Sequence, residues 1–175
     1  NCPHLLKGAR EGLRMGHGTL HDSMIHDGLW DAYSDFHMGC TGEIVAEKFN
    51  VTRQQQDEFA VRSHQRALKA IATGAFKDEI LKVEIPQKKG PAIVVENDES
   101  PRADTSMESL GRLKAAFKEG GTVTAGNASQ MSDGAAGVII MSAEKARQLG
   151  LKPLVRFVAF AAAGVEPDYM GVGPV

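Results

Sequence analysis

This sequence has no long apolar run, only two cysteines and almost no excess of either charge. Its longest apolar candidate, residues 154–165, contains Arg156 and falls short of the roughly 18 residues that a membrane-spanning helix needs. The two cysteines give no disulfide framework. A net charge of −2 without a basic block disfavours a nucleic-acid partner. We therefore expect a soluble, cytoplasmic protein with reduced thiols that binds neither membranes nor nucleic acid.

The composition is that of a globular protein. Hydrophobic residues make up 42% of the 175 residues and charged residues 24%, enough for one medium domain or two small ones. The N-terminus lacks an initiator Met and the ordered regions of a signal peptide, so we expect the start to be a cut or an omission. Residues 170–175 have the pattern of an interrupted loop.

Neither a metal site nor a nucleophile is evident from spacing. His17 and His21 are four residues apart, but they lie in a glycine-rich stretch without an obvious third ligand. Cys40 lies near a helix start, where the pKa of a thiol can be lowered. No partner histidine can be assigned to it, and a catalytic cysteine needs a base. We predict no metal and no catalytic residue in this chain.

Helical periodicity predicts helices over 41–49 and 52–73. In the second helix, Thr52 and Gln55 fit a capping box, and Gly74 lies where a C-terminal glycine would end it. We expect its polar face, made of Gln, Asp, Arg and Lys, to be solvated. Residues 1–39 are rich in glycine and predict loops and turns, apart from a possible short helical face near Met24.

Alternating apolar and polar residues predict strands over 79–85 and 92–95. A second capping box, formed by Thr105 and Glu108, predicts a helix over 105–117.

The last third of the chain is more apolar. Its unbroken apolar run predicts a strand over 137–141 that is buried on both faces. Ser142 should cap a short helix that ends at Gly150, and residues 154–161 predict a further strand.

The most informative segment is 122–137, which reads Thr-Val-Thr-Ala-Gly-Asn-Ala-Ser-Gln-Met-Ser-Asp-Gly-Ala-Ala-Gly. Its small and amide residues let another molecule approach the backbone closely. We expect Asn127 and Asp133 to be structural, because Asn and Asp bond local backbone in tight turns. The segment resembles a signature of the thiolase family, enzymes that make or break 3-ketoacyl-CoA by acyl transfer to a cysteine. The departure from that signature is residues 130–132, where many relatives have smaller residues and Asn.

The resemblance extends over essentially the whole chain and implies an incomplete thiolase fold of the α/β class. It implies an α+β loop domain over 1–121 that holds CoA. Residues 122–150 would then end the N-terminal α/β half of the fold, and residues 151–175 would begin the C-terminal half.

By residue type alone, the candidate site residues have ordinary structural explanations. A lone histidine such as His37 is more often structural than a ligand contact. Arg102 fits a solvated surface position, and Met170 fits a gap-filling core residue. For Ser129, a turn role and a ligand contact stay equally open.

The resemblance assigns these residues, and four others, to acyl-CoA binding. Thiolases carry a segment like His-Met-Gly at 37–39, with its histidine along the pantetheine arm of CoA and its methionine in the acyl pocket. They place an Arg and a Ser, at the spacing of Arg102 and Ser109, against the nucleotide end. The full set implied for substrate binding is Leu29, His37, Met38, Arg102, Ser109, Ala125, Ser129 and Met170.

The resemblance also implies that catalysis lies elsewhere, with a nucleophilic Cys upstream of Asn1 and with an Asn, a His and a second Cys downstream of Val175. The implied parent enzyme condenses two acetyl-CoA to acetoacetyl-CoA or runs the reverse thiolysis, with CoA as substrate and no cofactor. The alternatives are a longer-chain 3-ketoacyl-CoA thiolase and a non-catalytic CoA-binding or assembly domain. The family further implies a homo-oligomer, a tetramer or a dimer, with an arm from the first 39 residues joining dimers.

Overall fold

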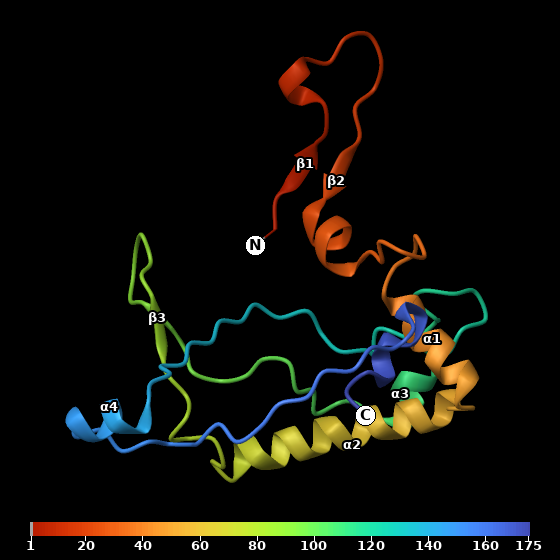
Figure 1. Cartoon of the computed structure of the whole chain (residues 1–175). Helices are drawn as coiled ribbons and strands as arrows, with labels where there is room; N and C mark the ends of the chain where they lie inside the picture. Colours follow the sequence, from red (N-terminus) through yellow and green to blue (C-terminus); the bar gives the residue numbers. More distant parts are fainter. Residues whose placement is uncertain (1) are drawn as a thin grey trace.

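The structure is a computed structural model that describes residues 2–175. Two consecutive helices, α1 and α2, form its base, a β-hairpin projects away from them at the N-terminus, and long extended segments run out to α4 and back (Figure 1). In chain order the elements are β1 (His4–Leu6), η1 (Ala9–Glu11), β2 (Leu20–Asp22), η2 (Met24–Leu29), α1 (Gly39–Lys48), α2 (Arg53–Ala72), β3 (Val83–Ile85), β4 (Ile93–Val95), α3 (Met107–Gly111), α4 (Ala143–Gln148) and η3 (Pro167–Val172).

Helix α2 begins and ends where its capping residues predict. The Thr52 hydroxyl accepts from the backbone N–H of Gln55, and the Thr52 N–H donates back to the Gln55 side chain at 2.8 Å, so the predicted capping box is confirmed. Gly74, just past the C-terminus, has a φ of +65°, the left-handed conformation that glycine adopts at little cost. Helix α1 spans Gly39–Lys48, close to the predicted 41–49.

Helix α3 is much shorter than predicted, and its cap lies one residue further along. The helix spans Met107–Gly111 instead of 105–117. The capping box is formed by Ser106 and Ser109, which exchange side-chain and backbone hydrogen bonds of 2.9 and 3.1 Å. The predicted box with Glu108 is therefore wrong, because Glu108 instead pairs with Arg112 one turn on.

The chain leaves the helical path after α3 because it pairs with the segment that follows. Ala115 forms an antiparallel bridge with Thr124, and the Ala116 N–H donates to the Val123 carbonyl at 2.9 Å. This pairing takes Phe117 out of the predicted helix and turns it toward α1, where it stacks on His37.

The strands of the described residues pair as two hairpins. β1 and β2 are antiparallel, with Leu5 opposite His21, and they form the hairpin that projects from the helices (Figure 1). β3 and β4 are also antiparallel, with Glu84 opposite Val94. The predicted strand over 79–85 is thus confirmed only from Val83, because the pairing with β4 begins there and residues 80–82 belong to no strand.

The predicted strands over 137–141 and 154–161 run extended, but they form no ladder with any residue among 2–175. Val138, Ile139 and Ile140 are 83–89% exposed, so the expectation of burial on both faces is wrong for this chain. The physical reason is that a strand is buried and satisfied only by neighbouring strands, whatever its own sequence favours.

The buried core of the described residues is small and half polar. Its apolar members are Ala46, Ala60, Leu110 and Ala146, and its polar members are Thr41, Glu43, Asp57 and Thr124. Because buried polar groups need hydrogen-bond partners, these four polar residues point to an organised network rather than to ordinary packing.

The packing of α3 against the 122–129 segment gives a first prediction. A Cβ on Gly126 would overlap the side chains of Leu110 and Leu113. We expect Gly126→Ala to lower the free energy of unfolding by about 1–3 kcal/mol, the usual range for overpacking. The measurement is urea unfolding followed by circular dichroism.

The matched control is Gly111→Ala, at the end of α3, where a Cβ meets no atom within 4 Å. This change should leave the free energy of unfolding unaltered or raise it slightly. Equal unfolding free energies for the two variants would contradict the close approach at Gly126.

Candidate functional site

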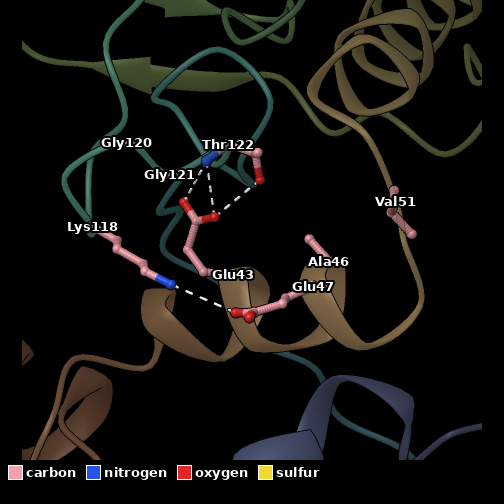
Figure 2. A pocket seen from close by; sticks show the side chains of 8 residues that line it. All are labelled: Glu43, Ala46, Glu47, Val51, Lys118, Gly120, Gly121 and Thr122. Atoms are coloured by element: carbon pink, nitrogen blue, oxygen red, sulfur yellow. Dashed lines mark hydrogen bonds and ion pairs between the residues drawn. The ribbon is translucent and has the colours of Figure 1, made fainter.

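The segment with the informative signature, which we call the 122–129 turn, is held at its first residues by Glu43 of α1. The carboxylate accepts the Thr122 N–H at 2.9 Å and the Thr122 hydroxyl at 3.0 Å (Figure 2). It also accepts the Val123 N–H at 2.8 Å. Lys118 lies beside this contact and pairs with Glu47 at 3.6 Å. A carboxylate that accepts several N–H donors makes charge-assisted hydrogen bonds, which are stronger than neutral ones.

These donors decide the protonation of Glu43. Burial raises the pKa of the carboxyl, but the hydrogen bonds from Thr122 and Val123 and the charge of Lys118 outweigh it, and the pKa is lowered below its ordinary value of 4.5. Glu43 is therefore ionised at neutral pH. It stabilises the start of the 122–129 turn as an anion.

Asp57 of α2 holds the other end of the 122–129 turn. Its carboxylate accepts from the Asn127 amide at 2.9 Å and from the Arg53 guanidinium at 2.7 Å, and only 2% of the residue is exposed. The prediction that the polar face of this helix is solvated is wrong at this position. The i,i+4 spacing of Arg53 and Asp57 in the sequence favours their ion pair, but it does not show that Asp57 is buried.

Asn127 organises the interior of the 122–129 turn. Its side-chain oxygen accepts the Thr124 N–H at 2.7 Å, and its amide also donates to the Thr122 carbonyl at 3.1 Å. The Thr124 hydroxyl, fully buried, accepts the Gly126 and Asn127 N–H groups. The predicted structural role of Asn127 is confirmed.

Arg53 extends the network to α3. One guanidinium nitrogen donates to the carbonyls of Leu110 at 2.6 Å and Leu113 at 3.1 Å, at the C-terminal end of α3. Ser109, on the same helix, is exposed. Its hydroxyl already accepts from the Ser106 N–H and donates to the Ser106 carbonyl, so one lone pair is left for a ligand.

His37 presents a defined hydrogen-bond donor at the approach to α1. Its Nδ1 accepts the Gly39 N–H at 2.9 Å, which assigns the proton of the neutral ring to Nε2. The ring stacks on Phe117 with 4.8 Å between centroids. Sequence reasoning placed Phe117 on a helix face and missed this contact, because only the pairing after α3 brings it to His37.

Leu29 and Met38 lie next to His37, where residues 29–30 pair with residues 37–38. The Met38 N–H donates to the Leu29 carbonyl at 2.7 Å, and Trp30 forms a bridge with His37. Leu29, His37 and Met38 are all half-buried, so this group offers apolar surface beside a single N–H donor.

Met170 reaches the same region from the C-terminal end. It lies on η3, which packs against α1, and it is exposed. The Ser34 hydroxyl donates to Asp168 at 2.8 Å, and the Lys48 ammonium lies 3.4 Å from the centre of the Tyr169 ring. The first contact ties η3 to the loop before His37, and the second ties it to the C-terminal end of α1.

Arg102 is exposed and its guanidinium is already engaged. It donates to both oxygens of Asp104 at 3.2 and 3.0 Å, while its backbone N–H donates to His64 of α2 at 3.1 Å. The hydrogen bonds and then the charge of Arg102 lower the pKa of Asp104. An anionic ligand would have to displace this carboxylate to reach Arg102.

Ser129 and Ala125 are both exposed on the 122–129 turn. Ser129 lines a groove of about 260 Å³ between α2, the 98–101 loop and the turn. A second groove, of about 200 Å³, lies over Glu43, Lys118 and Thr122 (Figure 2).

The structure thus brings the eight predicted residues together in two groups. Leu29, His37 and Met38 lie at the start of α1, and Met170 lies on η3, which packs against α1. Arg102, Ser109, Ala125 and Ser129 lie around α2, α3 and the 122–129 turn. The stretch from Ala115 to Thr124 joins the groups, because it carries Phe117 at one end and the contacts of Glu43 at the other.

Other chemistry finds little support in the described residues. The half-buried thiol of Cys40 donates to the Phe117 carbonyl at 3.9 Å, and Cys2 is exposed. Within residues 2–175, no three His, Cys, Asp or Glu side chains are grouped as a metal site would need. None of the helices in this part of the chain combines the length and hydropathy needed to cross a bilayer.

Comparison with known proteins gives consistent matches over the chain. The family model described as "Thiolase, N-terminal domain" matches residues 1–144. Acetyl-CoA acetyltransferase of Pseudomonas aeruginosa is 55% identical over 99% of this chain, and that of Allochromatium vinosum is 53% identical over 98%. The crystal structure of the Bacillus anthracis acetyl-CoA acetyltransferase superposes with a TM-score of 0.89 at 45% identity, covering 98% of this chain and 43% of that one. The chain spans 44% of the length of the two curated relatives.

The state of Glu43 predicts a pH dependence of stability. Because the pKa of Glu43 is lowered in the folded protein, its contribution is fully present above about pH 4.5 and is lost as the pH falls through the folded pKa. We expect Glu43→Gln to remove this part of the acid destabilisation. Urea unfolding from about pH 3 to about pH 7 measures it.

Glu58→Gln is the control, since it removes an exposed carboxylate on α2 that contacts Gln54 rather than the 122–129 turn. This variant should keep the wild-type pH profile. Parallel profiles for the wild type and Glu43→Gln would contradict the assignment.

Proposed function

Because the chain belongs to the thiolase family and adopts part of its α/β fold, we propose that it is the CoA-holding portion of an acetyl-CoA C-acetyltransferase. The observation that carries the proposal is the identity of 53–55% over nearly the whole chain to two relatives of that name. The parent enzyme would condense two acetyl-CoA to acetoacetyl-CoA and CoA, or run the reverse thiolysis. CoA would act as a substrate, and we propose no cofactor.

The group around α1 suits the pantetheine arm and the acyl end of the substrate. Pantetheine carries amide carbonyls, for which the Nε2–H of His37 is a suitable donor. Met38 and Met170 offer flexible apolar surface for a short acyl chain. Leu29 adds apolar surface beside them. A mostly apolar site with a few placed polar groups is typical for small ligands.

The group around the 122–129 turn suits the rest of CoA. Ser129 offers a hydroxyl to the pantetheine arm, and Ala125 lets the ligand approach the backbone closely. At the nucleotide end, Ser109 would accept a hydrogen bond through its free lone pair. Arg102 would bind phosphate by exchanging Asp104 for the ligand, since guanidinium matches both anions.

We place the acyl-transfer chemistry outside these 175 residues. Cys40 is half-buried against the Phe117 carbonyl, and a nucleophilic cysteine needs a base to form its thiolate. The role of this segment would be to orient the thioester with binding energy from the remote parts of CoA.

We further propose that the parent enzyme is a cytoplasmic homo-oligomer that binds neither nucleic acid nor membranes. The projecting hairpin exposes Leu5, Leu6 and Leu20, which would suit contact with another copy. A longer-chain acyl substrate is the second candidate, because a relative in Staphylococcus aureus, 48% identical over 99% of this chain, is named a probable acetyl-CoA acyltransferase.

The CoA contact of Ser129 is tested in the protein that carries this chain. Ser129→Ala should raise the KM for CoA about fivefold, the loss of about one hydrogen bond, and leave kcat nearly unchanged. Thiolysis of acetoacetyl-CoA measures both constants. Ser132→Ala, the same change at another exposed position, should alter neither. An unchanged KM in Ser129→Ala would refute the contact.

The division of labour is tested on the isolated segment. Residues 1–175 alone should show no thiolysis of acetoacetyl-CoA above the background without protein, because they would hold the substrate without a nucleophile. Cys40→Ser is the control that identifies any activity of the segment's own thiol. Turnover by the segment that Cys40→Ser abolishes would overturn the placement of catalysis.

A further inference from the structure

We propose that Glu43 and Asp57 are positioning residues for CoA: their carboxylates, from two successive helices, clamp the 122–129 turn from both ends. The proposal rests on the proposed function, because the clamp matters for binding only if Ala125 and Ser129 contact CoA. It assigns a role to two buried acids that neither touch the substrate nor take part in acyl transfer.

The two contacts fall at opposite ends of the same short segment. Glu43 accepts the N–H groups of Thr122 and Val123, where the chain enters the turn. Asp57 accepts the side-chain amide of Asn127, five residues further on. Ala125 lies between these points, and Ser129 follows two residues after Asn127. The backbone that presents both residues is therefore fixed from two directions.

The turn cannot replace these contacts from within. The amide of Asn127 divides its two hydrogens between Asp57 and the Thr122 carbonyl, while its oxygen accepts the Thr124 N–H. Loss of Asp57 would leave one buried amide hydrogen without an acceptor, and such a group costs free energy unless the chain rearranges. The rearrangement would occur in the segment that carries Ala125 and Ser129.

The clamp also links the two groups of site residues. Glu43 lies in α1, whose first turn follows His37 directly, and Asp57 lies in α2 near Arg53, which binds the end of α3. The 122–129 turn therefore keeps a fixed position relative to His37 on one side and to Ser109 on the other. A ligand as long as CoA, contacting both groups, requires that fixed relation.

Stability alone is a weak reason for this arrangement. Buried ion pairs and carboxylates cost desolvation free energy, and apolar residues of similar volume often stabilise a fold as well or better. Glu43 and Asp57 instead make directional hydrogen bonds to specific N–H groups, which set position.

The test uses steady-state thiolysis by the whole protein that carries this chain. Asp57→Asn keeps the size of the side chain but replaces one carboxylate oxygen, which accepts hydrogen bonds, with an amide NH2 group, which donates them. That donor would then face the donor of either Asn127 or Arg53. We expect the KM for CoA to rise about tenfold, equivalent to about 1.4 kcal/mol, with kcat within about twofold of wild type. A purely structural role would lower the melting temperature without this separation of KM from kcat.

A milder variant keeps the test decisive if Asp57→Asn does not fold. Thr122→Val preserves the branched shape and both backbone N–H contacts to Glu43, but removes the hydroxyl that donates to Glu43 and accepts from Gln56. It should raise the KM for CoA about threefold. Glu58→Gln, an exposed acid adjacent in sequence to Asp57, is the matched control and should leave the KM unchanged.

Ser129→Ala, measured alongside, separates the two ideas. If it raises the KM while folded Asp57→Asn and Thr122→Val do not, the clamp is refuted and the proposed function stands. If the wild-type protein neither binds CoA nor catalyses thiolysis, the proposed function fails and this inference fails with it. A fall in kcat with an unchanged KM in the clamp variants would also overturn the positioning role.

Discussion

The hydrogen bonds between the Glu43 carboxylate and the start of the 122–129 turn are the interaction on which the rest of this structure depends. They join α1 to a segment about 80 residues further along the chain. Through that segment they place Phe117 against His37 and set Thr124 in the interior. Without this contact, the helical base and the turn would have little apolar surface to hold them together, since the buried apolar residues are few and mostly alanine.

The polar character of this core has a physical consequence. Hydrogen bonds are directional, whereas apolar contacts tolerate sliding, so a core held by Glu43 and Asp57 fixes relative position more strictly than it adds stability. The exposed extended segments, in contrast, are apolar in sequence but are not buried. Their sequences favour strands, yet Val138, Ile139 and Ile140 face solvent because a strand needs partners for its backbone groups. The chain spans 44% of the length of the curated relatives that it matches.

Local signals predicted the features that local physics decides. The capping box at Thr52 and the glycine at Gly74 correctly delimited α2, because caps and left-handed glycines act within one turn of the chain. The fold class followed from the 122–137 signature and is matched by the thiolase structures. The predicted N-terminal cap of α3 is one residue off, because two capping patterns overlap there. The predicted C-terminal end is also wrong, because the pairing of Ala115 with Thr124 takes the chain out of the helix.

The candidate site also contains residues that the sequence singled out and residues that only contacts between distant segments reveal. The resemblance singled out the half-buried His37 and the exposed Ser129, but the sequence did not identify the buried Asp57 or the contact of Phe117 with His37. A buried aspartate and a solvated one have the same sequence pattern on a helix, and only the position of Asn127 distinguishes them. The residues proposed to touch CoA were chosen from sequence because they lie in segments that resemble a family motif. The residues that hold them are set by contacts between distant segments, such as those of Glu43 and Asp57 with the 122–129 turn, and under the proposed function those contacts would fix the spacing between the two groups of site residues.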